Sequence, residues 1–249
     1  MVTRGVEKLS QRDDIELIGK LIRAGDLDHA ESRCHALIEK GGTGLGEVFH
    51  LRGVVDLRRD EARSAVQWFQ RAAEQGAGDP GFLSNLGEAY RRLGNYVEAK
   101  DVLERSMQAD NSITATHFNL AKVYRALGQA RFAEHFFRNV LILDPAKGRA
   151  HFELAELYRS EGHMKEAAIE YQAAIKIALP AGKVMTQEEM VSLSSWMSSF
   201  GSLLRECGST RQALEILEQA IDWNGQNSIA RFEYGRCLLE IFREDDARR

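Results

Sequence analysis

A period of 34 residues runs through most of this chain and constrains its fold more than any other feature of the sequence. When the chain is shifted by one period, the segment SNLGEAYRRLGNYVEA (84–99) aligns with FNLAKVYRALGQARFA (118–133) and FELAELYRSEGHMKEA (152–167). The residues that recur in all three segments are Tyr90, Tyr124 and Tyr158, Gly94, Gly128 and Gly162, and Ala99, Ala133 and Ala167. A fixed period of this length is typical of repeat proteins, in which each unit packs mainly on its neighbours.

Each repeat has the spacing of two helices that are separated by a turn. Across residues 83–90 the apolar side chains follow a spacing of i, i+3, i+4 and i+7, and Gly94 then interrupts the pattern. A second helical segment follows and carries Ala99. No segment alternates with period two over a useful length, so we predict an all-α fold without strands.

These positions resemble the tetratricopeptide repeat, a helix–turn–helix unit of 34 residues. That family has Leu-Gly at positions 7 and 8, Tyr at 11, Gly at 15, Ala at 20, an aromatic residue at 24 and Pro at 32. The repeat at 114–147 matches it with Leu120, Ala121, Tyr124, Gly128, Ala133, Phe137 and Pro145. The resemblance implies a right-handed superhelical α-solenoid, in which the small residue at position 8 lets two helices approach closely.

The resemblance divides the chain into about six and a half repeats that follow a short N-terminal tail, residues 1–10. The repeats are placed at 11–45, 46–79, 80–113, 114–147, 148–181 and 194–227, with a partial repeat at 228–249. The first repeat is degenerate, as the terminal units of repeat proteins commonly are. We therefore predict a single solenoid domain over 11–249.

Twelve additional residues, 182–193, interrupt the repeat pattern. Thr186 and Glu189 have the spacing of a capping box, which predicts a lengthened helix from about 187 to 206. This extra length is either a harmless elongation or a contact for a partner or a second copy of the chain. The side chains that would make such a contact are Met190, Leu193 and Trp196.

The last segment begins a seventh repeat, with Tyr234, Gly235 and Leu238 at positions 7, 8 and 11. Two interpretations stay open for this partial repeat. It is either a capping helix with a charged tail, or the start of a repeat that was cut inside a longer protein. Ala247 falls at position 20, where the second helix of a repeat carries alanine, and this favours the cut repeat.

Composition and charge argue against several classes of partner. The chain has 33 Lys and Arg against 37 Asp and Glu, so its net charge of −4 gives no basic footprint for nucleic acid. No run approaches the roughly 18 apolar residues of a membrane span, and the first residues have no apolar signal core. We therefore expect a cytoplasmic protein with no nucleic-acid partner and no membrane span. Cys34, Cys207 and Cys237 are too few for a disulfide framework, and we place them at or near the helical core.

No motif for catalysis or metal binding stands up to inspection. The glycine-rich stretch at 41–48 lacks both the G-x-G-x-x-G spacing and the lysine of a phosphate loop, so we interpret it as a linker. Cys34 beside His35 offers too few ligands for a metal site. His117 and His151 recur at the packing position 4, so we expect them to be interior or half-buried. We predict no enzymatic activity, no cofactor and no metal.

The family resemblance places positions 2, 5, 6, 9, 12 and 13 on a concave groove. Asn85 and Asn119 occupy position 6 of consecutive repeats, and an amide can both donate to and accept from a peptide backbone. This is similar to the asparagine ladder of the O-GlcNAc transferase superhelix. Only a short stretch matches, because the same position elsewhere holds Leu51, Glu153, Ser199 and Glu233. The alternative is that both asparagines are simply solvated helix residues.

Arginine recurs at position 12 of three successive repeats, as Arg91, Arg125 and Arg159. These side chains either complement the dipole at the end of a helix or bind carboxylates and phosphates in a bidentate manner. Lys122 at position 9 adds positive charge, whereas Glu88 and Glu156 at the same position of the neighbouring repeats reduce it. An acidic peptide is therefore a more suitable ligand than a nucleic-acid backbone.

Two further sets of side chains belong to the predicted groove. Phe118 and Phe152 recur at position 5, where they form either an apolar wall for a partner or packing between first helices. Ser198 and Ser202 lie at positions 5 and 9 of the sixth repeat. Their small hydroxyl groups leave room for a bulky side chain of a ligand, or they are plain surface.

These patterns favour a non-catalytic scaffold or adaptor that binds a peptide segment of another protein in its concave groove. The bound segment would be extended or helical, and an acidic one suits the arginines best. The alternative is the substrate-recruiting region of a larger enzyme, such as a glycosyltransferase or methyltransferase, whose catalytic domain would follow residue 249. Self-association through the exposed terminal repeats, giving a homo-oligomer, is a third interpretation.

Overall fold

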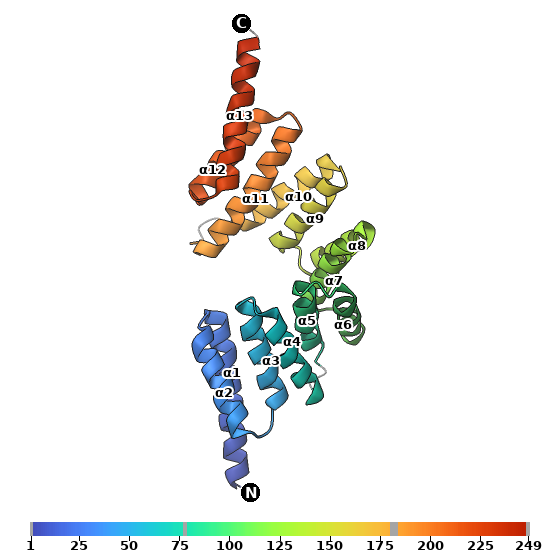
Figure 1. The fold of residues 1–249 in the computed structure, drawn as a ribbon, viewed down its shortest axis with the longest axis vertical. Helices are drawn as coiled ribbons and strands as arrows, with labels where there is room; N and C mark the ends of the chain where they lie inside the picture. The colour runs from blue at the N-terminus through green and yellow to red at the C-terminus, as the bar shows by residue number, and fades with distance from the viewer. Residues whose placement is uncertain (1, 77–78, 180–183, 248–249) are drawn as a thin grey trace. The chain divides into compact units, whose positions relative to one another are not determined.

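The computed structural model describes the backbone of residues 2–76, 79–179 and 184–247, and the side chains of these ranges from Arg12 to Arg243. The described residues form thirteen α-helices and contain no strand (Figure 1). From α1 to α7 and from α8 to α13, consecutive helices pack on one another. The prediction of an all-α solenoid is therefore confirmed.

The bounds of the helices follow the predicted repeats closely. In chain order they are α1 (Val2–Ala24), α2 (Leu27–Lys40), α3 (Leu45–Arg58), α4 (Ala62–Glu74), α5 (Pro80–Arg92), α6 (Tyr96–Ala109), α7 (Thr114–Ala126), α8 (Ala130–Leu143), α9 (Gly148–Ser160), α10 (Met164–Ala178), α11 (Gln187–Glu206), α12 (Thr210–Trp223) and α13 (Ser228–Ala247). Odd-numbered helices are the first helices of the repeats, and even-numbered helices are the second.

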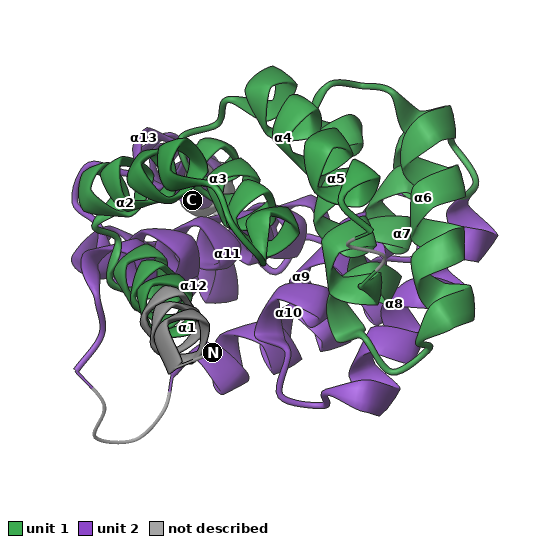
Figure 2. Cartoon of the chain, turned by 90° about the horizontal axis from the view of Figure 1, so that it is seen from below, with its two compact units in different colours: residues 1–129 green, residues 130–249 purple. Residues whose placement is uncertain are grey.

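The chain divides into two compact units at the junction between Gln129 and Ala130 (Figure 2). Unit 1, drawn in green, holds α1 to α7, and unit 2, drawn in purple, holds α8 to α13. The boundary falls inside the fourth predicted repeat, so α7 and α8 belong to different units. A single solenoid domain over 11–249 stays a prediction.

The core of unit 1 lies between its successive helical hairpins. Ala30 and Cys34 of α2 pack against Val48 and Val55 of α3, and all four are fully buried. Within the α3–α4 hairpin, a Cβ atom on Gly53 would lie less than 3.0 Å from the side chain of Phe69. Position 8 therefore requires a very small residue there, as the repeat pattern predicts.

The core of unit 2 centres on the lengthened helix α11. The predicted capping box is present, because the Glu189 amide donates to Thr186 Oγ1 at 3.2 Å and the Thr186 amide donates to the Glu189 carboxylate at 2.9 Å. Leu193 and Trp196 are buried in the core of this unit, and Met190 is half-buried. This packing takes up most of the surface of Leu193 and Trp196, and a partner contact through the extra length of α11 stays a prediction.

Several local predictions are settled by the helices themselves. His117 is buried and His151 is half-buried, as expected. Cys34 and Cys237 are buried, but Cys207 is exposed, because it lies at the end of α11 where the chain leaves the core.

The ends of three segments differ from their predicted form. The tail expected at 1–10 is helical from Val2 onward, as part of α1. The linker expected at 41–48 is shorter, because α3 already begins at Leu45. Ala247 belongs to α13 itself and not to a second helix, because the helix of the partial repeat continues through the expected turn.

Candidate functional site

The two asparagines of the predicted ladder lie between successive first helices of unit 1. The amide nitrogen of Asn85 on α5 is 2.9 Å from Nε2 of His50 on α3. Asn119 on α7 is buried, and its amide donates to the carbonyl oxygen of Ser84 on α5 at 3.4 Å. Each amide thus bonds to a helix of the preceding repeat. A role in holding a peptide stays a prediction, and would have to use the remaining capacity of the same amides.

His50, the partner of Asn85, is a buried neutral base. Its ring stacks on Phe82 with centroids 3.6 Å apart, and only 8% of the residue is exposed. Burial lowers the pKa of His50 to about 4, against a small opposing effect of Asp79. A neutral ring is what the contact with Asn85 requires, because Nε2 must accept the amide hydrogen.

Two of the predicted arginines at position 12, Arg91 and Arg159, are engaged by carboxylates of the protein itself. Arg91 on α5 donates from Nε and Nη2 to Glu88 at 2.6 and 2.8 Å. Burial disfavours the charged form of Glu88, but hydrogen bonds from Arg91 and Arg92 outweigh it and lower the pKa of Glu88. An acidic ligand at Arg91 would therefore have to compete with Glu88.

The remaining predicted residues of unit 1 lie together on α7. Phe118, Lys122 and Arg125 are half-buried, and Lys122 Nζ lies 5.6 Å from the centre of the Phe118 ring. That distance is within the range of a cation–π contact. A part in binding stays a prediction for all three.

Unit 2 brings three of the predicted residues into one hollow of about 320 Å³. Arg159 reaches it from α9, and Ser198 and Ser202 reach it from α11. The other residues that line it are Val191, Ser195, Ser199, Asn224, Gln226, Asn227, Ser228 and Ile229. The lining is mostly hydroxyl and amide groups, which donate and accept hydrogen bonds.

Arg159 closes one side of this hollow. Its Nη2 donates to Ser202 Oγ at 3.0 Å and to Glu206 at 2.5 Å, and its Nη1 is 3.5 Å from the carbonyl oxygen of Ser199. Burial opposes the charge of Arg159, but Glu206 raises the pKa of the guanidinium, so the group stays charged. The hollow therefore has one fixed cation that is shared with a half-exposed carboxylate.

Ser198 is a buried residue of the lining, and its side chain does not face solvent. It is 2% exposed, and its hydroxyl donates to the Ser194 carbonyl at 2.7 Å. Asn227 donates to the hydroxyl groups of Ser194 and Ser198 at 2.8 and 2.9 Å. The accessible hydroxyl groups are those of Ser195, which is exposed, and of the half-buried Ser199 and Ser202.

Phe152, the second aromatic residue at position 5, packs inside unit 2. Its ring stacks on Trp196 with centroids 5.4 Å apart, and it lies 5.9 Å from the ring of Tyr171. The residue is half-buried, so only part of the ring is left for any partner.

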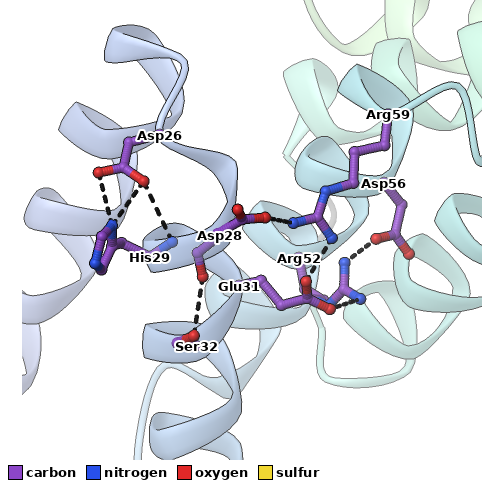
Figure 3. A network of polar contacts seen from close by, with 8 residues as sticks. All are labelled: Asp26, Asp28, His29, Glu31, Ser32, Arg52, Asp56 and Arg59. Carbon is purple, nitrogen blue, oxygen red and sulfur yellow. Dashed lines mark hydrogen bonds and ion pairs between the residues drawn. The ribbon is translucent and has the colours of Figure 1, made fainter.

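A charged network in unit 1 was missed by the sequence reasoning (Figure 3). Glu31 on α2 accepts from Arg52 at 2.5 Å and from Arg59, and the Arg59 hydrogen bond is the main cause of the lowered pKa of Glu31. Arg52 also pairs with Asp56, which is fully buried and accepts a hydrogen bond from Ser64. The network joins the first repeat to the second.

A signal for this network was present in the sequence. Arg52 and Asp56 occupy positions 7 and 11 of their repeat, where the three repeats over 80–181 carry leucine and tyrosine. Two opposite charges four residues apart at packing positions predict a buried ion pair, because neither charge is stable there alone.

The described residues contain no group of three or more side chains arranged to hold a metal ion.

Comparison with known proteins gives a consistent result for the fold. Residues 83–112 and 118–182 each match a family model described as a tetratricopeptide repeat. No curated protein matches the sequence significantly. Within the described parts of the chain, every helix is too short or too polar to cross a lipid bilayer.

Three solved structures illustrate the similarity. A thermophilic TPR protein of Thermus thermophilus is 18% identical, with a TM-score of 0.61 over 78% of this chain and 99% of that one. Pseudomonas aeruginosa pilF is 17% identical, with a TM-score of 0.70 over 94% and 98% of the two chains. YrrB, described as a TPR protein with an unusual peptide-binding site, is 19% identical, with a TM-score of 0.53 over 74% and 89%. At these identities the likeness shows the fold alone.

Proposed function

Because the chain is a tetratricopeptide-repeat protein, we propose that it is a scaffold for protein–protein interaction that holds a peptide segment of its partner and catalyses no reaction itself. The observation that carries the proposal is the hollow of unit 2. Stacked helical hairpins bury the apolar positions of each repeat and leave the remaining positions free to be shaped for a ligand.

The chemistry of the hollow suits a peptide better than an apolar small molecule. Its volume of about 320 Å³ is at the lower end of ligand pockets, which is enough for a few side chains of a peptide. Hydroxyl and amide groups of Ser195, Ser199 and Gln226 can pair with backbone N–H and C=O groups. A carboxylate of the peptide would take the place of Glu206 on Arg159, which exchanges one charge-assisted hydrogen bond for another.

The predicted residues of unit 1 form a second proposed set of contacts. Asn85 and Asn119 would bind peptide backbone, and Arg91, Arg125 and Lys122 would bind acidic side chains. Phe118 would supply apolar contact in this set, and Phe152 would supply apolar contact separately, within unit 2. The similarity to YrrB, whose description names a peptide-binding site, supports peptide binding as a function of this fold.

The test of the hollow uses peptides that are selected from a random library on the wild-type chain. Ser195→Trp fills the hollow from an exposed position, so it should abolish binding of the selected peptides while the fold is kept. Gln212→Trp, at an exposed position of α12 outside the hollow, is the matched control and should bind as the wild type does. Equal binding by all three proteins would rule out the hollow as the peptide site.

The asparagines require a separate experiment. Asn85→Ala combined with Asn119→Ala should weaken binding of a selected peptide by about 1–3 kcal/mol if both amides hold its backbone. Calorimetry measures this change, and thermal unfolding of the same variant measures the loss of the bonds to His50 and Ser84. A lower melting temperature with unchanged affinity would show that the amides only join helices.

A further inference from the structure

The hollow of unit 2 offers a ligand two different kinds of surface. Its apolar lining residues are Val191 of α11 and Ile229 of α13, whose exposed fractions are 42% and 63%. Among the described residues that line the hollow, Arg159 is the only one with a charged side chain. The other lining side chains carry hydroxyl or amide groups. A ligand that fills the hollow therefore meets both exposed apolar surface and a cation.

Val191 reaches the hollow because α11 is lengthened by the inserted residues 182–193. This helix has 20 residues, whereas the first helices of the four preceding repeats, α3, α5, α7 and α9, have 13 or 14. Successive residues of a helix are rotated by about 100°, so Val191 lies on the same face as Ser195, Ser198 and Ser202, which all line the hollow. The insertion thus adds an apolar end that a first helix of the usual length would lack.

Ile229 contributes apolar surface from the helix beside α11. The residue before α13, Asn227, donates to the hydroxyl groups of Ser194 and Ser198 at 2.8 and 2.9 Å, which holds the start of α13 against α11. Ile229 follows two residues later, in the first turn of α13, and lines the same hollow as Val191. The apolar surface of the hollow is therefore supplied by two neighbouring first helices.

Arg159 supplies the cation, at the part of the hollow that Ser202 lines. Its guanidinium donates to Ser202 at 3.0 Å and to Glu206 at 2.5 Å, and the Glu206 side chain is 36% exposed. Glu206 is the last residue of α11, where the helix dipole opposes a negative charge. A carboxylate of a ligand can therefore replace Glu206 on Arg159, and Glu206 then returns to water. Glu206 acts as an internal competitor for acidic ligands.

The distance between the two ends sets the spacing of side chains in the ligand. Val191 and Ser202 are eleven residues apart on α11, which corresponds to about 16 Å along the helix axis. In an extended peptide, side chains four residues apart point to the same side and are about 13 Å apart. The lengths of a leucine and a glutamate side chain cover the remaining distance.

We propose that the hollow binds an extended peptide that carries a large apolar residue and an acidic residue four positions apart. The apolar side chain packs on Val191 and Ile229, and the carboxylate pairs with Arg159 in place of Glu206. This inference rests on the proposed function, because it specifies which peptide the same hollow holds. It gives the inserted turns of α11 a role in selecting the partner.

The first test uses peptides that are selected from a random library on the wild-type chain and are lost by Ser195→Trp. These peptides should be enriched in the apolar and acidic pair at a spacing of four, in one order or the other. Replacing the apolar residue of such a peptide by alanine should weaken binding by about tenfold, and Val191→Ser should weaken binding by about threefold or more. The matched control is Val184→Ser, which removes an exposed valine of the same inserted segment outside the lining.

The second test concerns the acidic residue of the same peptides. Glu206→Gln removes the competing carboxylate, so it should strengthen binding of an acidic peptide by about twofold to fivefold. It should not strengthen binding of a version of the peptide that carries glutamine in place of the acidic residue. Glu218→Gln makes the same change of net charge at an exposed position of α12 outside the lining, and should leave both affinities unchanged.

Two results would overturn this inference and leave the proposed function intact. One is a set of selected peptides that Ser195→Trp no longer binds but that carry no such pair of residues. The other is equal binding of these peptides by the wild type, Val191→Ser and Glu206→Gln. Equal binding of the selected peptides by the wild type and Ser195→Trp would instead overturn the proposed function, and this inference with it.

Discussion

Gly201 of α11 and Gly235 of α13 occupy the same position of their repeats and have opposite surroundings. A Cβ atom on Gly201 would lie 2.6 Å from Leu217, whereas a Cβ atom on Gly235 would meet nothing within 4 Å. Glycine is a steric necessity at position 201, where Leu217 packs against it, whereas at position 235 glycine only reduces helix stability. The repeat pattern thus places a residue on a helix face, but it does not say whether another helix covers that face.

The largest expected difference concerns the free energy of unfolding when a large side chain beside Gly201 or Gly235 is replaced by alanine. Leu217→Ala should lower the free energy of unfolding by about 2–5 kcal/mol, because it leaves a cavity in a fully buried site. Phe242→Ala, on the helix that carries Gly235, should change the free energy of unfolding by no more than about 0.5 kcal/mol, because the ring is exposed. Urea unfolding followed by circular dichroism measures both. A large loss for Phe242→Ala would mean that the face of α13 is covered after all.

The next expected effect is a pH dependence of stability at α3, a first helix that packs against the first helix of the next repeat, unlike the exposed face of α13. His50 on α3 packs against α5, and burial lowers its pKa to about 4, below the usual value of about 6.5. Protonation therefore favours the unfolded state, so this contribution to stability is complete above about pH 6.5 and is lost as the pH falls toward 4, by about 2–3 kcal/mol.

His50→Gln is the control for this pH dependence. Glutamine does not titrate, and its side-chain oxygen can still accept a hydrogen bond from Asn85. Unfolding experiments between pH 7 and about pH 4 should show a flatter curve for the variant than for the wild type. The same slope in both proteins would assign the acid sensitivity to other groups.

A smaller loss of stability is expected when Gly201 is replaced by alanine. Gly201→Ala should destabilise the chain by about 1–3 kcal/mol, because its Cβ atom overlaps Leu217. In the background of Leu217→Ala this penalty should largely disappear, and a double-mutant cycle measures that coupling. Additive effects of the two substitutions would show that the contact between Gly201 and Leu217 does not explain the glycine.

The smallest effect has the opposite sign. Gly235→Ala should stabilise the unbound chain by about 0.5–1 kcal/mol, because alanine loses less conformational entropy in a helix than glycine and meets no steric obstacle there. Thermal unfolding of the chain without added peptide measures this change. Destabilisation similar to that of Gly201→Ala would contradict the open space around Gly235.

Much of the fold could be predicted from the sequence because its signals are local. The hairpins follow from helical spacing, and the start of α11 follows from Thr186 and Glu189, which lie three residues apart and bind each other's backbone. The burial of His117 follows from its position in the repeat. Each of these inferences needs only one helix or one hairpin, whose geometry the nearby residues determine.

The candidate site was predictable only in part, because its contacts join residues that are far apart in the sequence. Position 12 predicted three similar arginines, but Arg91 pairs within its own helix, whereas Arg159 reaches across 43 residues to Ser202. The bond between Asn85 and His50 spans 35 residues, and no local pattern predicts it.

The repeat, the helices and the position of each residue within its repeat follow from the amino-acid sequence alone. Which of those positions another helix covers is known only from the packing of the helices, as Gly201 and Gly235 show. The physical reason is that helical periodicity depends on neighbouring residues of one chain segment. Burial and pairing of a side chain depend on which other helix packs against it.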